Sequence, residues 1–185
     1  MFFTEQTKTG DESDADETSR THTNIFNNRL AMNEYLLEAR EELKRLEHIL
    51  YVSLKYTRTV DVLINALHRL VSIFDLIILA LLEQARAEKH LAANPKSPAL
   101  RSTTLGELYP DDEQLQRDLS FYLFLRTVLK LPHKKRQEYR RHVTLIVEFE
   151  TATAEIDSDN LLNCEKFVHR FLRYAYQKIE GEEKE

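Results

Sequence analysis

The chain has 185 residues and a mass of 21.8 kDa, which suits a single domain with a core of ordinary size. Hydrophobic residues make up 42% and charged residues 31%, a composition that argues against both a disordered chain and a membrane protein. The formal net charge is −5, and the presence of only three glycines and four prolines favours long helices over many short strands.

The first 23 residues are polar and acidic and show no hydrophobic periodicity. We therefore expect a disordered acidic tail over 1–23, a single helical domain over 24–181 and a disordered C-terminus over 182–185. The tail lacks a basic segment followed by an apolar one, so no secretory signal is expected. The single cysteine, Cys164, excludes an intramolecular disulfide and indicates a reducing compartment, which we take to be the cytoplasm.

Two long helices are expected after the tail. Over about 27–56, one residue in every three or four falls on a common helical face: Leu36, Ala39, Leu43, Leu46, Leu50 and Ser53. Over about 59–89, a second seam has heptad spacing: Ile64, Leu67, Val71, Phe74, Ile78 and Leu81. The second segment is apolar on most sides, which indicates the central helix of the fold. Its longest apolar run is shorter than the roughly 20 residues of a membrane span.

The next segment, 92–103, contains two prolines and is expected to be a surface loop. A third helix should begin near Asp111, where neighbouring carboxylates suit a helix N-terminus. Pro132 marks a break, after which the basic segment is expected to run as a short helix to about His142. We use the name basic segment for residues 130–142.

The chain after the basic segment predicts strands and then a last helix. Residues 143–156 are rich in alternating and β-branched residues, which indicates a two-stranded hairpin that packs on helices. Asp157 or Ser158 should cap the last helix, which ends near Gly181. The predicted fold class is therefore mainly α, a bundle of four or five helices with a small β-hairpin before the last helix.

Six cations lie in the basic segment, and Glu138 is its one carboxylate: Lys130, Lys134, Lys135, Arg136, Arg140 and Arg141. Two interpretations remain open. In one, RNA or another polyanion neutralises these cations, and Tyr139 stacks on a base. In the other, the segment is a solvated surface that pairs with carboxylates elsewhere in this acidic chain.

Arg136 is followed by five residues and then His142, with the polar Gln137 directly after the arginine. This pattern resembles the signature of HEPN-domain proteins, which are small all-helical domains. The layout of helices over about 30–180 is also similar, although strands after His142 would depart from it. Many members of that family dimerise, so that two motifs face one cleft, and act as metal-independent ribonucleases or as non-catalytic RNA-binding modules.

If the resemblance holds, His142 would act as general acid or base on a ribose 2′-hydroxyl or a leaving oxygen. Arg136 would hold the scissile phosphate. The leading hypothesis is an RNA-contacting domain, and its phosphate ligands are drawn from the six cations of the basic segment. The alternative is a scaffold protein that forms a homodimer through the seams of the first two helices. Membership of a toxin–antitoxin pair also stays open, as does another protein partner.

Other candidate sites have less support. A polar stripe along the second helix is read as an exposed edge rather than a cleft: Asp61, Asn65, His68, Ser72 and Asp75. If Asp75 is buried, its partner should be a hydroxyl or an arginine, and Arg126 is the candidate. No HExxH and no histidine pair at i,i+4 occurs, so neither a metal site nor a cofactor is expected. Cys164 is read as a core residue.

Overall fold

The structure is a computed structural model, and it describes residues 32–180. Residues 32–48 are helical and continue into a π-helical turn and one more helical turn. The helical elements after residue 48 are η1 (Ile49–Ser53), α2 (Leu54–Tyr56), α3 (Val60–Ala87), α4 (Pro98–Leu108), α5 (Glu113–Lys130) and α6 (Ser158–Glu180). The tail expected over 1–23 and the C-terminus expected over 182–185 lie outside the described residues. The mainly α fold class is confirmed.

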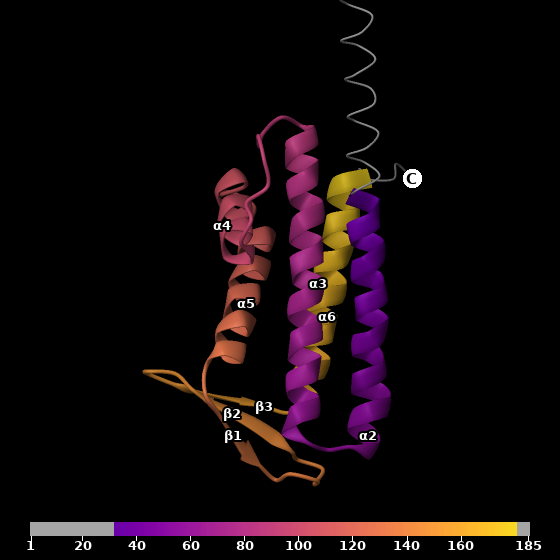
Figure 1. Cartoon of the computed structure of the whole chain (residues 1–185), viewed down its shortest axis with the longest axis vertical. Helices are drawn as coiled ribbons and strands as arrows, with labels where there is room; N and C mark the ends of the chain where they lie inside the picture. The colour runs from indigo at the N-terminus through magenta and orange to yellow at the C-terminus, as the bar shows by residue number, and fades with distance from the viewer. Residues whose placement is uncertain (1–31, 181–185) are drawn as a thin grey trace, which may run out of the picture.

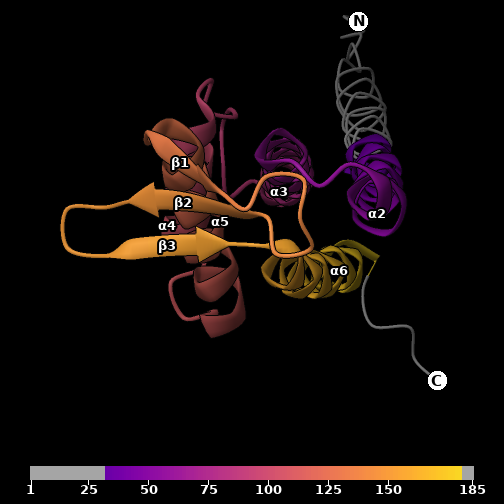
Figure 2. The ribbon, with the colours of Figure 1, turned by 90° about the horizontal axis from the view of Figure 1, so that it is seen from below.

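The helices form two layers (Figure 1). The helix over 32–48 stands beside α3 and α6, while the shorter α4 and α5 pack on the other side of α3. Seen from below, a small sheet lies across one end of the bundle, under α5 and next to the start of α3 (Figure 2). This end of the molecule brings together the basic segment and the connection between α2 and α3.

The central position predicted for the second helix is confirmed by α3. Its side chains are buried along most of its length, with Leu63, Leu67 and Phe74 fully inaccessible. Thr59 caps its N-terminus by accepting a hydrogen bond from the backbone N–H of Val62. Among the described residues, α3 alone has the length and hydropathy of a membrane span, a property that it shares with buried core helices.

The seam of the first helix is also confirmed, because Leu36, Ala39 and Leu46 are fully buried. These residues pack against α3 and α6 of the same chain in one continuous core. This chain's own core therefore covers the first seam, whereas Ile64 and Val71 of the α3 seam are only half-buried. Homodimerisation through these seams stays a prediction.

The loop expected over 92–103 is wrong from Pro98 onward, where α4 begins. Ser97 is the N-cap and accepts a hydrogen bond from the N–H of Leu100 at 3.2 Å. Pro98 occupies the first turn, where its missing N–H has no intrahelical partner to lose and its fixed φ already suits a helix. The proline that suggested a break is thus part of a helix start.

The sheet contains three antiparallel strands in the order β1 (His133–Arg136), β2 (Thr144–Glu148) and β3 (Thr153–Ile156). The predicted hairpin is confirmed as β2 and β3. The short helix expected for the basic segment is wrong, because residues 133–136 form β1 and residues 137–143 form the loop that follows. Pro132 disfavours helical backbone at the preceding residue, and β2 supplies an edge for the emerging chain to pair with.

Side chains of the sheet alternate between two faces. Leu145 and Val147 of β2 are buried against the helices. Lys134 and Arg136 pair in register with Ile146 and Thr144, so they lie on the opposite, outer face. The basic strand can therefore expose its cations while its neighbour contributes to the core.

Candidate nucleic-acid interface

The cations of β1 on the outer face are neutralised within the sheet. Lys134 Nζ lies 2.5 Å from a carboxylate oxygen of Glu148. The Arg136 guanidinium binds Glu155 through two hydrogen bonds, of 2.8 and 2.5 Å. This bidentate contact raises the pKa of Arg136 and lowers the pKa of Glu155. For these two cations, the contacts favour the interpretation of a solvated, paired surface.

Lys135 lies on the other face of β1 and is also paired. Its ammonium is 3.0 Å from Asp61, at the start of α3, and 3.7 Å from Glu138. Glu138 in turn accepts a hydrogen bond of 3.2 Å from the backbone N–H of Val60. The three cations of β1 thus anchor the basic segment to the sheet and to α3.

The loop over 137–143 is held against the connection between α2 and α3. The backbone N–H of Tyr139 donates a hydrogen bond of 2.7 Å to the carbonyl of Arg58. Gln137 and Tyr139 have φ values of +54° and +65°, a region that side-chain-bearing residues adopt infrequently. Figure 2 shows this loop beside the α2–α3 connection. The contact fixes the direction in which the loop presents its side chains.

The loop exposes an aromatic ring between cations. Tyr139 is 80% exposed. Arg140 and Arg141 follow it, and both are exposed and form no carboxylate contact within residues 32–180. His142 is exposed as well, and only its backbone carbonyl is engaged, by the hydroxyl of Thr144. Lys130 ends α5 and also makes no ion pair within the described range.

The end of α2 and the α2–α3 connection add a second set of such residues. Tyr56 is 80% exposed, as Tyr139 is. Lys55 and Arg58 flank Tyr56, and neither pairs with a carboxylate in the part of the chain that the structure describes. We define the basic–aromatic surface by six residues of these two segments: Lys55, Tyr56, Arg58, Tyr139, Arg140 and Arg141.

The basic–aromatic surface differs from the predicted site. It keeps Tyr139, Arg140 and Arg141, while the cations of β1 pair with carboxylates instead. The stretch 55–58 was missed, because in sequence it reads only as the polar end of a helix. The sequence signal for this part of the surface was the motif KYTR, in which an aromatic residue lies between two cations. Arg136 and His142, the pair that carries the HEPN resemblance, lie on a strand and in a loop rather than on a helix, and their proposed roles stay predictions.

A partly buried polar network joins α3 to α5, as the sequence suggested for Asp75. The hydroxyl of the fully buried Tyr122 donates to the carboxylate of Asp75, and Arg126 donates to that hydroxyl at 2.7 Å. Arg126 also lies 3.8 Å from Asp75, which confirms the predicted partner. Burial raises the pKa of Asp75 more than Tyr122 and Arg126 lower it. The network links α3 to α5 and is only partly shielded from solvent.

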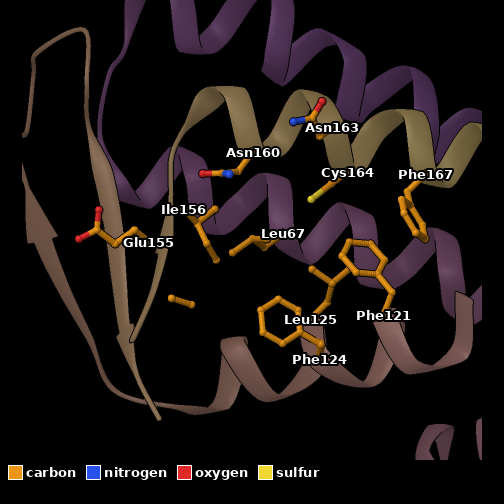
Figure 3. Close-up of a pocket in the computed structure, with 11 residues that line it drawn as sticks. Leu67, Phe121, Phe124, Leu125, Glu155, Ile156, Asn160, Asn163, Cys164 and Phe167 are labelled. Carbon is orange, nitrogen blue, oxygen red and sulfur yellow. The ribbon is translucent and has the colours of Figure 1, made fainter. Parts of the chain in front are cut away.

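An apolar cavity of about 360 Å³ lies between β3, α5 and α6. Figure 3 shows the rings of Phe121, Phe124 and Phe167 at one side of it, and the carboxylate of Glu155 directed away from them. Cys164 lines the cavity, and burial raises the pKa of its thiol to about 11. The thiol is therefore protonated at neutral pH, in agreement with a packing role rather than a nucleophilic one.

Comparison with known proteins adds no family to this picture. No family model, curated protein or solved structure matches the chain.

Proposed function

We propose that this protein binds single-stranded RNA through the basic–aromatic surface. The observation that carries the proposal is the pair of tyrosines, each 80% exposed, set among four cations that have no carboxylate partner among residues 32–180. Exposed rings stack on bases of any sequence, and each stacked base contributes about 1–3 kcal/mol. The neighbouring cations would meet the phosphates, and the arginines would do so through planar, forked donors.

The charge distribution supports a local and salt-sensitive contact. The chain as a whole is acidic, at −5, so long-range attraction to RNA is weak. Binding would depend on the few cations that reach the phosphates, and the cations of β1 are already engaged by Glu148, Glu155 and Asp61. Moderate affinity without strong sequence preference is the expected behaviour.

We propose RNA rather than DNA as the ligand because of the HEPN resemblance. The same resemblance suggests ribonuclease activity, which is proposed separately from binding. For Arg136 to hold a scissile phosphate, its guanidinium would have to exchange Glu155 for the phosphate. His142 is exposed near the end of the loop over 137–143, where a substrate could reach its imidazole. Cleavage would need no metal ion, so it would persist in EDTA.

The binding test is fluorescence anisotropy with a short labelled single-stranded RNA. Replacing both tyrosines, in Tyr56→Ala/Tyr139→Ala, should weaken binding by about tenfold or more, because at least one stacked base is lost. The matched Tyr56→Phe/Tyr139→Phe protein should bind like wild type, since phenylalanine keeps the ring face. Equal losses of affinity in both proteins would contradict stacking. No loss in either protein would contradict the proposal that RNA binds at the basic–aromatic surface.

The charge test uses the same assay. Arg140→Ala/Arg141→Ala should weaken binding, whereas Lys166→Ala/Arg173→Ala should not, although it removes the same charge from exposed positions on α6. Equal effects of the two double variants would mean that only net charge matters. Incubation with a structured RNA in EDTA, beside His142→Ala, tests cleavage independently of binding.

A further inference from the structure

Four side chains with metal-binding chemistry converge between the first helix and α6, outside the basic–aromatic surface. Glu47 and Tyr51 are four residues apart on the first helix and its π-helical turn η1, and Glu165 and His169 are four residues apart on α6. Residues at this spacing lie on one helical face, so each helix presents two groups to the other. The imidazole Nε2 of His169 is 3.1 Å from Glu47 and 3.9 Å from Glu165.

The carboxylate of Glu165 is buried without a cationic side chain to balance it. Its side chain is 7% exposed, and it accepts a hydrogen bond of 2.7 Å from the Tyr51 hydroxyl. No lysine or arginine between residues 32 and 180 pairs with Glu47 or Glu165. A buried carboxylate without a cationic partner is costly, and a bound metal ion would supply that partner.

The π-helical turn directs Tyr51 toward this cluster. A π turn carries an extra residue per turn, which rotates the side chains that follow it relative to a regular α-helix, and such turns occur frequently at functional sites. Here η1 begins two residues after Glu47 and contains Tyr51, the residue that binds Glu165. The irregular backbone thus coincides with the polar cluster.

We propose that Glu47, Glu165 and His169 bind a divalent transition-metal ion of the Zn²⁺ type. Zinc takes nitrogen and carboxylate ligands at about 2.0–2.2 Å in tetrahedral geometry, which places neighbouring ligand atoms about 3.4 Å apart. The two separations from His169, 3.1 and 3.9 Å, bracket that value, and the ligand atoms of all three residues lie within 4.8 Å of one another. Small side-chain shifts would close the site.

Water would complete the coordination, because Glu47 and His169 are partly exposed, at 36% and 47%. Tyr51 acts as a positioning residue that orients the Glu165 carboxylate. The ion would clamp α6 to the first helix. This proposal does not depend on RNA binding.

The test uses the full chain, stripped with EDTA and desalted, and titrated with Zn²⁺ by calorimetry and with Co²⁺ by visible absorption. One ion should bind per chain and raise the melting temperature, and Co²⁺ should show the intense bands of a tetrahedral site. Removing a ligand in His169→Ala or Glu47→Gln should weaken binding by more than about 100-fold, and Tyr51→Phe by about tenfold.

His90→Ala is the matched control, because His90 also faces a carboxylate, Glu88 at 3.5 Å, but has no second one. This variant should bind Zn²⁺ like wild type. Circular dichroism of each variant separates lost ligation from lost folding, and the exposure of Glu47 makes Glu47→Gln the milder change. The proposal is overturned if Zn²⁺ does not bind saturably, or if Glu47→Gln and His169→Ala proteins that remain folded bind as tightly as the control.

Discussion

The network of Asp75, Tyr122 and Arg126 allows a quantitative prediction about stability. Replacing Arg126 with methionine keeps most of the aliphatic packing but removes the guanidinium, 2.7 Å from the Tyr122 hydroxyl and 3.8 Å from Asp75. Breaking a fully buried pair costs about 3–5 kcal/mol. Asp75 and Arg126 retain side-chain exposures of 29% and 21%. We therefore expect the free energy of unfolding to fall by about 2–3 kcal/mol at neutral pH, near or below the lower end of that range.

The pH dependence identifies the cause of that loss. Arg126 lowers the pKa of Asp75, so its removal moves an already raised pKa further upward. A carboxyl whose pKa is higher in the folded than in the unfolded state adds stability at pH values below its unfolded pKa. That contribution is lost as the pH rises through the folded pKa. The deficit of Arg126→Met relative to wild type should therefore shrink as Asp75 becomes protonated.

Urea unfolding near pH 7 and again near pH 4.5 measures both effects. Arg117→Met, an exposed change on the same helix, should alter stability by less than about 0.5 kcal/mol. Asp75→Asn/Arg126→Met should recover part of the loss, because no uncompensated charge remains. A deficit of the same size at both pH values would refute the reasoning and point to lost packing.

Three further outcomes are expected. For RNA binding, a plot of log affinity against log salt should have a slope of about −3, since four cations each contribute about 0.7, and Arg140→Ala/Arg141→Ala should reduce it by about 1.4. Asp118 is fully buried; one of its oxygens is unpaired and the other accepts a hydrogen bond of 3.3 Å from Arg170. Burial raises the pKa of Asp118 more than Arg170 lowers it, so Asp118→Asn should raise the urea midpoint near pH 7 but not near pH 4. Ser97→Ala removes the cap of α4 and should cost about 1 kcal/mol, measured by urea unfolding.

Features that follow from local periodicity could be predicted from the sequence. The buried faces of the first helix and α3 were found because each apolar position depends only on its neighbours three and four residues away. The pairing of Asp75 with Arg126 could also be predicted from the sequence. A charged group on an apolar helix needs a partner, and few candidates exist in the other apolar helix.

Features that depend on distant segments could not be predicted. The basic segment has no helical or strand signal strong enough to decide its structure, and β1 forms because β2 offers an edge. The basic–aromatic surface requires Arg58 to meet Tyr139, and the cluster on α6 requires Glu47 to meet His169. No motif spacing encodes such contacts, so the metal cluster escaped a search for histidine pairs.

The charged side chains of β1 have a consequence that does not depend on any ligand. β1 is an edge strand of the sheet, and an edge strand exposes backbone groups to which another chain can add. Two copies that met edge to edge would bring Lys134 and Arg136 of one against the same cations of the other. The paired carboxylates soften this repulsion but do not make the edge apolar. The basic strand should therefore disfavour self-association through this edge of the sheet, and exchanging its lysines for threonine should make concentrated solutions aggregate.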